Sequence, residues 1–160
     1  MAIVWTRPQA IIPSFARLLN FENVSLDTIL DEVDQYASQL ISILGKVKAV
    51  VVPTWIMPYR ERGLGVIDMT HLQGIGYILM HMNLRLVERL REHKSIYVID
   101  THKWMSADGK DSYTNCFWYM TKAPFSLGVY LEAVYDIKAL VSAIRGESKK
   151  LLVLDLDDTL

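Results

Sequence analysis

Short apolar runs alternate along this chain with longer segments whose apolar residues recur every three or four positions. The runs are the expected strands, at residues 2–5, 47–52, 95–99 and 151–154. The longer segments predict helices over residues 26–44, 71–93 and 127–145, with a shorter one over 14–19. This alternation predicts an α/β fold of three layers, in which a mostly parallel sheet carries helices on both faces.

Composition narrows the class of protein further. The 160 residues suit a single domain with a usable core, and a formal net charge of −1 argues against nucleic-acid binding. Cys116 is the single cysteine, so we expect no disulfide framework and no cysteine metal cluster. No apolar run is long enough for a membrane span, and the first residues lack the layout of a signal peptide. A cytoplasmic protein is therefore expected.

The end of the chain carries the pattern with the clearest chemistry. An apolar run over residues 151–154 leads into Asp155, which is followed by Asp157 and Thr159. An aspartate at the end of a strand can attack a phosphoryl group, and a second carboxylate can protonate the leaving oxygen. A magnesium ion held by both carboxylates would offset their repulsion. The alternative interpretation is an ordinary strand followed by an acidic turn.

This ending resembles motif I of the haloacid dehalogenase superfamily. The resemblance implies that Asp155 is the nucleophile, Asp157 the general acid/base and Thr159 a supporting hydroxyl, with Mg2+ bound by the two aspartates. The superfamily also needs a downstream serine or threonine, a lysine and an acidic pair. We therefore expect no phosphatase activity from these 160 residues. Magnesium-dependent turnover that Asp155→Asn abolishes would contradict this expectation.

Other stretches extend the resemblance over most of the chain. In order, they are Trp5-Thr6-Arg7-Pro8, Glu32-Val33-Asp34, Met82-Asn83-Leu84, Asp100 with Trp104, and Trp118-Tyr119 before Lys122-Ala123-Pro124-Phe125-Ser126. Together they resemble the FkbH-like proteins of haloacid dehalogenase subfamily IIIC. The resemblance implies an SGNH-hydrolase-like (flavodoxin-like) domain over residues 1–148, with residues 149–160 as the first strand and motif I of a truncated dehalogenase-like domain.

The same resemblance implies a function and partners. Family members studied as enzymes take a glyceryl unit from a phosphoglycerate donor, remove phosphate and load an acyl carrier protein. This chain would then be an accessory domain, inactive alone, with a role in substrate placement, carrier-protein docking or dimerisation. The strand at residues 151–154 is expected to join the edge of this domain's sheet or that of a second copy, which would give a homodimer.

Two other functions remain open on sequence. An SGNH-like esterase or acyltransferase would need a serine beside a histidine at the carboxyl edge of the sheet, yet the start of the chain has no Gly-Asp-Ser block. Asp68 and His71 have the Asp-x-x-His spacing of that group, but they lie before a helix in mid-chain, and we interpret the match as chance. An unrelated soluble binding domain, with a coincidental ending, is the third alternative.

Candidate binding residues can be placed from the expected sheet. Polar and aromatic residues at or near its carboxyl edge would gather around any pocket there: Trp55, Arg60, Asn83, Asp100 and His102. Arg60 and His102 are equally compatible with solvated loop positions. Asn83 lies on an apolar helix face, where an amide without partners costs about 1–3 kcal/mol. We therefore expect its side chain to hydrogen-bond a nearby loop, with a structural role favoured.

Overall fold

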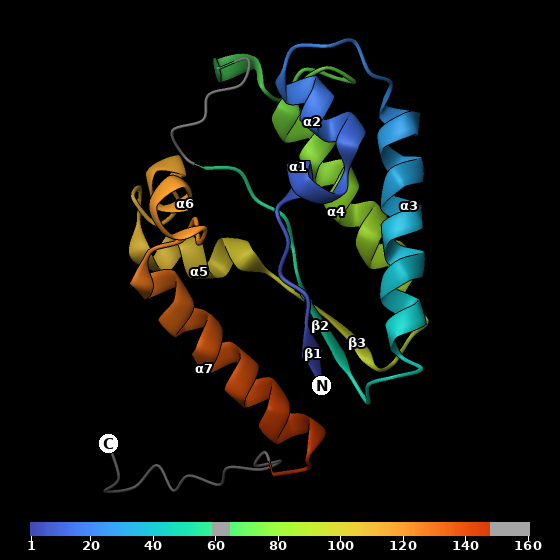
Figure 1. The fold of residues 1–160 in the computed structure, drawn as a ribbon, viewed down its shortest axis with the longest axis vertical. Coiled ribbons are helices and arrows are strands. Elements are labelled where there is room, and N and C mark those ends of the chain that lie inside the picture. The colour runs from blue at the N-terminus through green and yellow to red at the C-terminus, as the bar shows by residue number, and fades with distance from the viewer. Residues whose placement is uncertain (59–64, 148–160) are drawn as a thin grey trace, which may run out of the picture.

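The computed structural model describes residues 1–58 and 65–147 and has an all-parallel three-stranded sheet at its centre (Figure 1). The strands are β1 (Ala2–Ile3), β2 (Val50–Pro53) and β3 (Ile96–Ile99), in the order β1-β2-β3. Val50 lies opposite Ala2 on one side and Ile96 on the other. The predicted α/β class is confirmed, while the expected fourth strand, over residues 151–154, lies outside the described residues.

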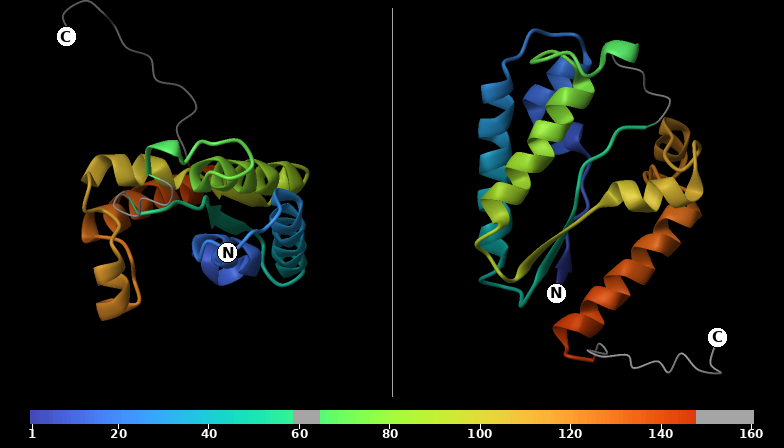
Figure 2. Two further views of the ribbon diagram at one scale, coloured as in Figure 1. Left: turned by 90° about the horizontal axis from the view of Figure 1, so that it is seen from above. Right: turned by 180° about the vertical axis from the view of Figure 1, so that it is seen from behind.

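Helices connect the strands and follow β3. They are α1 (Pro8–Ile11), α2 (Pro13–Leu19), α3 (Leu26–Ile43), α4 (Ile75–Leu90), α5 (Thr101–Asp108), α6 (Asn115–Thr121) and α7 (Leu127–Ile144), with a 3-10 turn at Gly65–Ile67. The views in Figures 1 and 2 show α1–α4 gathered on one side of the sheet and α5–α7 on the other.

The sheet separates two apolar clusters, because successive residues of a strand point to opposite faces. Val52 and Val98 belong to the larger cluster, which the helices α1 to α4 complete. Ile99, the next residue along β3, packs instead with Trp104 of α5 and Val129 of α7 in the smaller cluster. All four residues of β2 are buried, as its valine-rich sequence predicts for a central strand.

Helix ends follow the predicted capping residues in two places and depart from prediction in others. A serine directly before each expected helix, Ser25 and Ser126, predicts an N-cap at both places. Their hydroxyls accept hydrogen bonds from the backbone N–H groups of Thr28 and Val129, which confirms both caps. The predicted start of a helix at residue 71 is wrong. α4 begins at Ile75, because turns occupy residues 68–73 and the Asp68 carbonyl accepts the N–H of Tyr77.

The segment between β3 and α7 is more helical than its sequence predicts. The polar composition of residues 106–115 predicts a loop, but α5 runs to Asp108, and a second helix, α6, begins at Asn115. The aromatic residues of α6 predict a segment that packs inward as a whole. That is wrong for Tyr119 and Met120, which are 77% and 76% exposed, because a helix turns part of any apolar run toward solvent.

Several large apolar side chains of α7 are exposed to solvent. Four of these exposed residues recur at successive helical turns: Leu127, Leu131, Val134 and Tyr135. Val129 and Ala133, in contrast, face the smaller cluster.

Every helix in the described part of the chain is too short or too polar to cross a bilayer.

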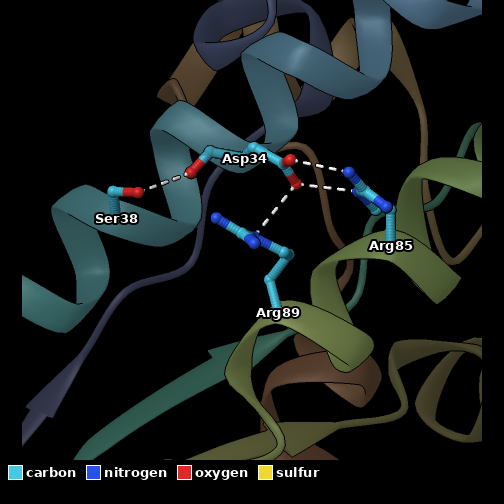
Figure 3. Close-up of polar contacts among 4 residues, drawn as sticks. All are labelled: Asp34, Ser38, Arg85 and Arg89. Carbon is cyan, nitrogen blue, oxygen red and sulfur yellow. Dashed lines mark hydrogen bonds and ion pairs between the residues drawn. The ribbon is translucent and has the colours of Figure 1, made fainter.

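A partly exposed ion pair joins α3 to α4 (Figure 3). The Asp34 carboxylate accepts hydrogen bonds from Nε and Nη2 of Arg85, both at 2.8 Å, and lies 3.3 Å from Nε of Arg89. The hydrogen bond with Asp34 raises the pKa of Arg85 above its usual value. A two-pronged contact of this geometry fixes the register of one helix against the other.

Asp34→Asn is expected to lower the urea midpoint of unfolding, because the asparagine removes the charge that pairs with both arginines. The loss should shrink between about 0.1 M and about 1 M salt, since added ions screen partly exposed pairs. Glu132 is exposed on α7, on the other side of the sheet from α3 and α4, so Glu132→Gln serves as the control. A loss for Asp34→Asn that is independent of salt would contradict an ionic contribution.

Candidate functional site

A cavity of about 500 Å3 lies where β2 and β3 end beside α4. Most of its wall is apolar and comes from Met69, Leu79, Met80 and Leu84. Its polar groups belong to Thr54, Asn83, Asp100 and His102. Three of the five predicted binding residues therefore line one cavity at the carboxyl edge of the sheet, where parallel α/β folds bind ligands.

The amide of Asn83 holds the backbone that follows β2. Its Oδ1 accepts the N–H of Trp55 at 2.9 Å, and its Nδ2 donates to the Trp55 carbonyl at 2.8 Å. The prediction that this amide hydrogen-bonds a nearby loop is confirmed. Both polar atoms of the amide are thus occupied, so Asn83 shapes the cavity wall by fixing the chain at Trp55.

A second set of hydrogen bonds ties the ends of the two strands together. The Thr54 hydroxyl accepts the N–H of Thr101 at 3.0 Å, and the Thr101 hydroxyl donates to the Thr54 carbonyl at 2.8 Å. Oδ1 of Asp100 accepts the N–H of His102 at 3.0 Å and caps the start of α5. The edge that carries the polar groups is therefore fixed by backbone contacts from both strands.

The side chain of His102 is exposed and borders two cavities. Besides the cavity above, it lines a neighbouring one of about 420 Å3 with Ser106 and Ser112. The Ser106 hydroxyl donates to the main-chain carbonyl of His102 at 2.9 Å, and the Ser112 hydroxyl contacts the Met105 sulfur at 3.3 Å. Neither of these hydroxyl contacts involves the imidazole, which is the group that would have to activate a serine.

Trp55 contributes its backbone to the site, whereas its side chain lies in the core. The residue is 1% exposed, and its indole N–H donates to the Thr6 hydroxyl at 3.0 Å. The same hydroxyl lies 3.2 Å from the Tyr36 phenol oxygen, whose pKa is raised by burial. Arg60, the remaining predicted binding residue, lies outside the described residues.

The residues predicted to act on phosphate come at the end of the sequence. Asp155, Asp157 and Thr159, with the Mg2+ site assigned to the two aspartates, lie outside the described residues. Within residues 1–58 and 65–147, no group of three or more His, Cys, Asp or Glu side chains is gathered for a metal ion. The exposed His71 ring packs edge-on against Tyr77 at 5.3 Å between centroids.

Sequence reasoning missed the two threonines of this edge. Thr54 directly follows β2, and Thr101 follows β3 after one residue, Asp100. A short hydroxyl side chain just beyond each strand end is the signal that could have found them. A hydroxyl there can bond the backbone of the neighbouring strand end.

Comparisons of this chain with models of protein families, with curated proteins and with solved structures give no match.

Proposed function

We propose that residues 1–148 form a non-catalytic domain that places a substrate for a dehalogenase-like domain beginning at residue 149, as in the FkbH-like proteins that the sequence resembles. The observation that carries the proposal is the cavity at the carboxyl ends of β2 and β3, with its apolar wall and its Asn83, Asp100 and His102 side chains. Together with a complete dehalogenase-like domain, Asp155 and Asp157 would bind Mg2+ and act on a phosphoglycerate-type donor.

The chemistry of the cavity selects among the substrates that the resemblance implies. Met69, Leu79, Met80 and Leu84 supply an apolar wall, and Asp100 brings a carboxylate that would repel a phosphate. Such a cavity suits an acyl group joined to an arm that forms hydrogen bonds better than it suits phosphoglycerate. We therefore assign it to the acyl arm of a carrier protein.

Butyryl-pantetheine, a small stand-in for such an arm, tests this assignment by calorimetric titration. Met80→Trp is expected to abolish binding, because Met80 is 54% exposed, lines the cavity and can be enlarged into it. Val87, 43% exposed on the same helix, is not part of the lining, so Val87→Trp should leave the affinity unchanged. Equal affinities for the two variants would contradict a ligand in this cavity.

A second candidate, an esterase or acyltransferase, is favoured by His102, Ser106 and Ser112 lining one cavity. The contacts that the two hydroxyls make, to a carbonyl and to a thioether, leave neither serine activated. We expect a fluorophosphonate probe to label neither serine. Covalent labelling of one of them that His102→Ala removes would support the esterase instead.

A further inference from the structure

A separate cavity of about 370 Å3 lies between the segment that comes after β1 and the helices α6 and α7. Four aromatic rings line it, from Trp5, Trp118, Phe125 and Tyr130. Two cations, Arg7 and Lys122, line it as well. These residues come from parts of the chain more than a hundred positions apart. They share none of the lining of the cavity assigned to the acyl arm, so a ligand bound here is independent of the proposed function.

Both cations of this cavity lie against the ring of Trp118. Neither has a carboxylate partner within the described residues. The guanidinium carbon of Arg7 lies 4.2 Å from the centroid of the Trp118 ring, and Nζ of Lys122 lies 5.6 Å from it. Nε of Arg7 is also buried without a hydrogen-bond partner in the described structure. A ring face offsets only part of the desolvation of a cation, and a buried N–H without an acceptor is unfavourable.

The aromatic side chains beside these cations pack against one another. Trp5 stacks on Phe125 with centroids 4.7 Å apart, and Tyr130 meets Trp5 edge-on at 5.5 Å. Burial raises the pKa of Tyr130 above the usual value of a phenol. A flat apolar group therefore has rings to pack against, close to the donors that an anion needs.

We propose that this cavity binds a small organic anion, with a phosphate or carboxylate between Arg7 and Lys122 and a flat apolar group against Trp5 and Phe125. The anion neutralises two like charges that lie against one ring and have no carboxylate partner among the described residues. The apolar group adds contacts that inorganic phosphate cannot make.

A substitution at Lys122 can separate the loss of a charge from a loss of stability. It ends α6 with a φ of 59°, a left-handed conformation that favours glycine, while its N–H donates to the Trp118 carbonyl. Lys122→Gly removes the cation and relieves this backbone strain together, so binding and folding should respond in opposite directions. A loss of affinity in this variant is then attributable to the missing charge.

The test is a calorimetric titration with phenyl phosphate, with inorganic phosphate and phenol as separate probes. Phenyl phosphate should bind at least about tenfold more tightly than either, and Lys122→Gly should weaken it about tenfold without lowering the urea midpoint. Lys46 is exposed just before β2 and does not line this cavity, so Lys46→Gln should leave the affinity unchanged. Absent binding, equal affinity for inorganic phosphate, or full affinity in Lys122→Gly would overturn the proposal.

Discussion

Asn83→Ala is expected to lower the free energy of unfolding by about 2–4 kcal/mol, because it leaves two backbone groups of Trp55 without partners. Trp55 is 1% exposed, so its N–H and carbonyl cannot recover hydrogen bonds from solvent unless the chain moves. Urea denaturation, followed by tryptophan fluorescence and by far-UV circular dichroism, measures the loss directly.

The same substitution should also affect the cavity, because Asn83 fixes the chain beyond the end of β2. Leu84 is the matched control, since it is the next residue of α4, lines the same cavity and is 57% exposed. Leu84→Ala is expected to change stability by no more than about 0.5 kcal/mol. If Asn83→Ala were as well tolerated as Leu84→Ala, the amide would not be holding Trp55.

Gly74→Ala is expected to destabilise the fold by about 1–3 kcal/mol through a steric clash. A β-carbon at Gly74 would lie 2.0 Å from the backbone oxygen of Asp68 and 2.7 Å from the backbone nitrogen of Thr70. Backbone atoms cannot rotate away as a side chain can, so either the 68–74 segment or the start of α4 must shift. Met69 lines the cavity, and the shift would therefore reach its wall.

Gly45→Ala separates this clash from a general effect of replacing glycine. A β-carbon at Gly45 would have its nearest neighbour at 3.7 Å, an ordinary contact, so that variant should retain the stability of the parent. Thermal unfolding of the two variants makes the comparison. Equal melting temperatures for Gly74→Ala and Gly45→Ala would show that Asp68 does not approach Gly74 closely.

Features that depend on local periodicity or capping were predictable from the sequence. α3 and α7 are predictable because their apolar residues recur at helical spacing and a serine precedes each. The hydrogen bonds of the Asn83 amide could be expected from the cost of burying it unpaired, although its partner could not be named. Trp55 is that partner, and it lies 28 positions away in sequence.

The features that escaped prediction depend on short helices and on contacts that the fold creates. α5 and α6 span eight and seven residues, too few for a periodic pattern to stand out, and their caps at Asp100 and Thr114 resemble ordinary loop residues. The inward direction of the Trp55 indole depends on Thr6, which β1 brings to it from the start of the chain. No local pattern encodes such a contact.

A titration with butyryl-pantetheine, followed through the backbone amide signals of the isotopically labelled protein, tests the account most directly. The shifted signals are expected to cluster at Trp55, Asn83, Asp100 and His102, around the ends of β2 and β3. Signals that stay unchanged at a saturating concentration, or shifts confined to residues away from this edge, would contradict a binding site there.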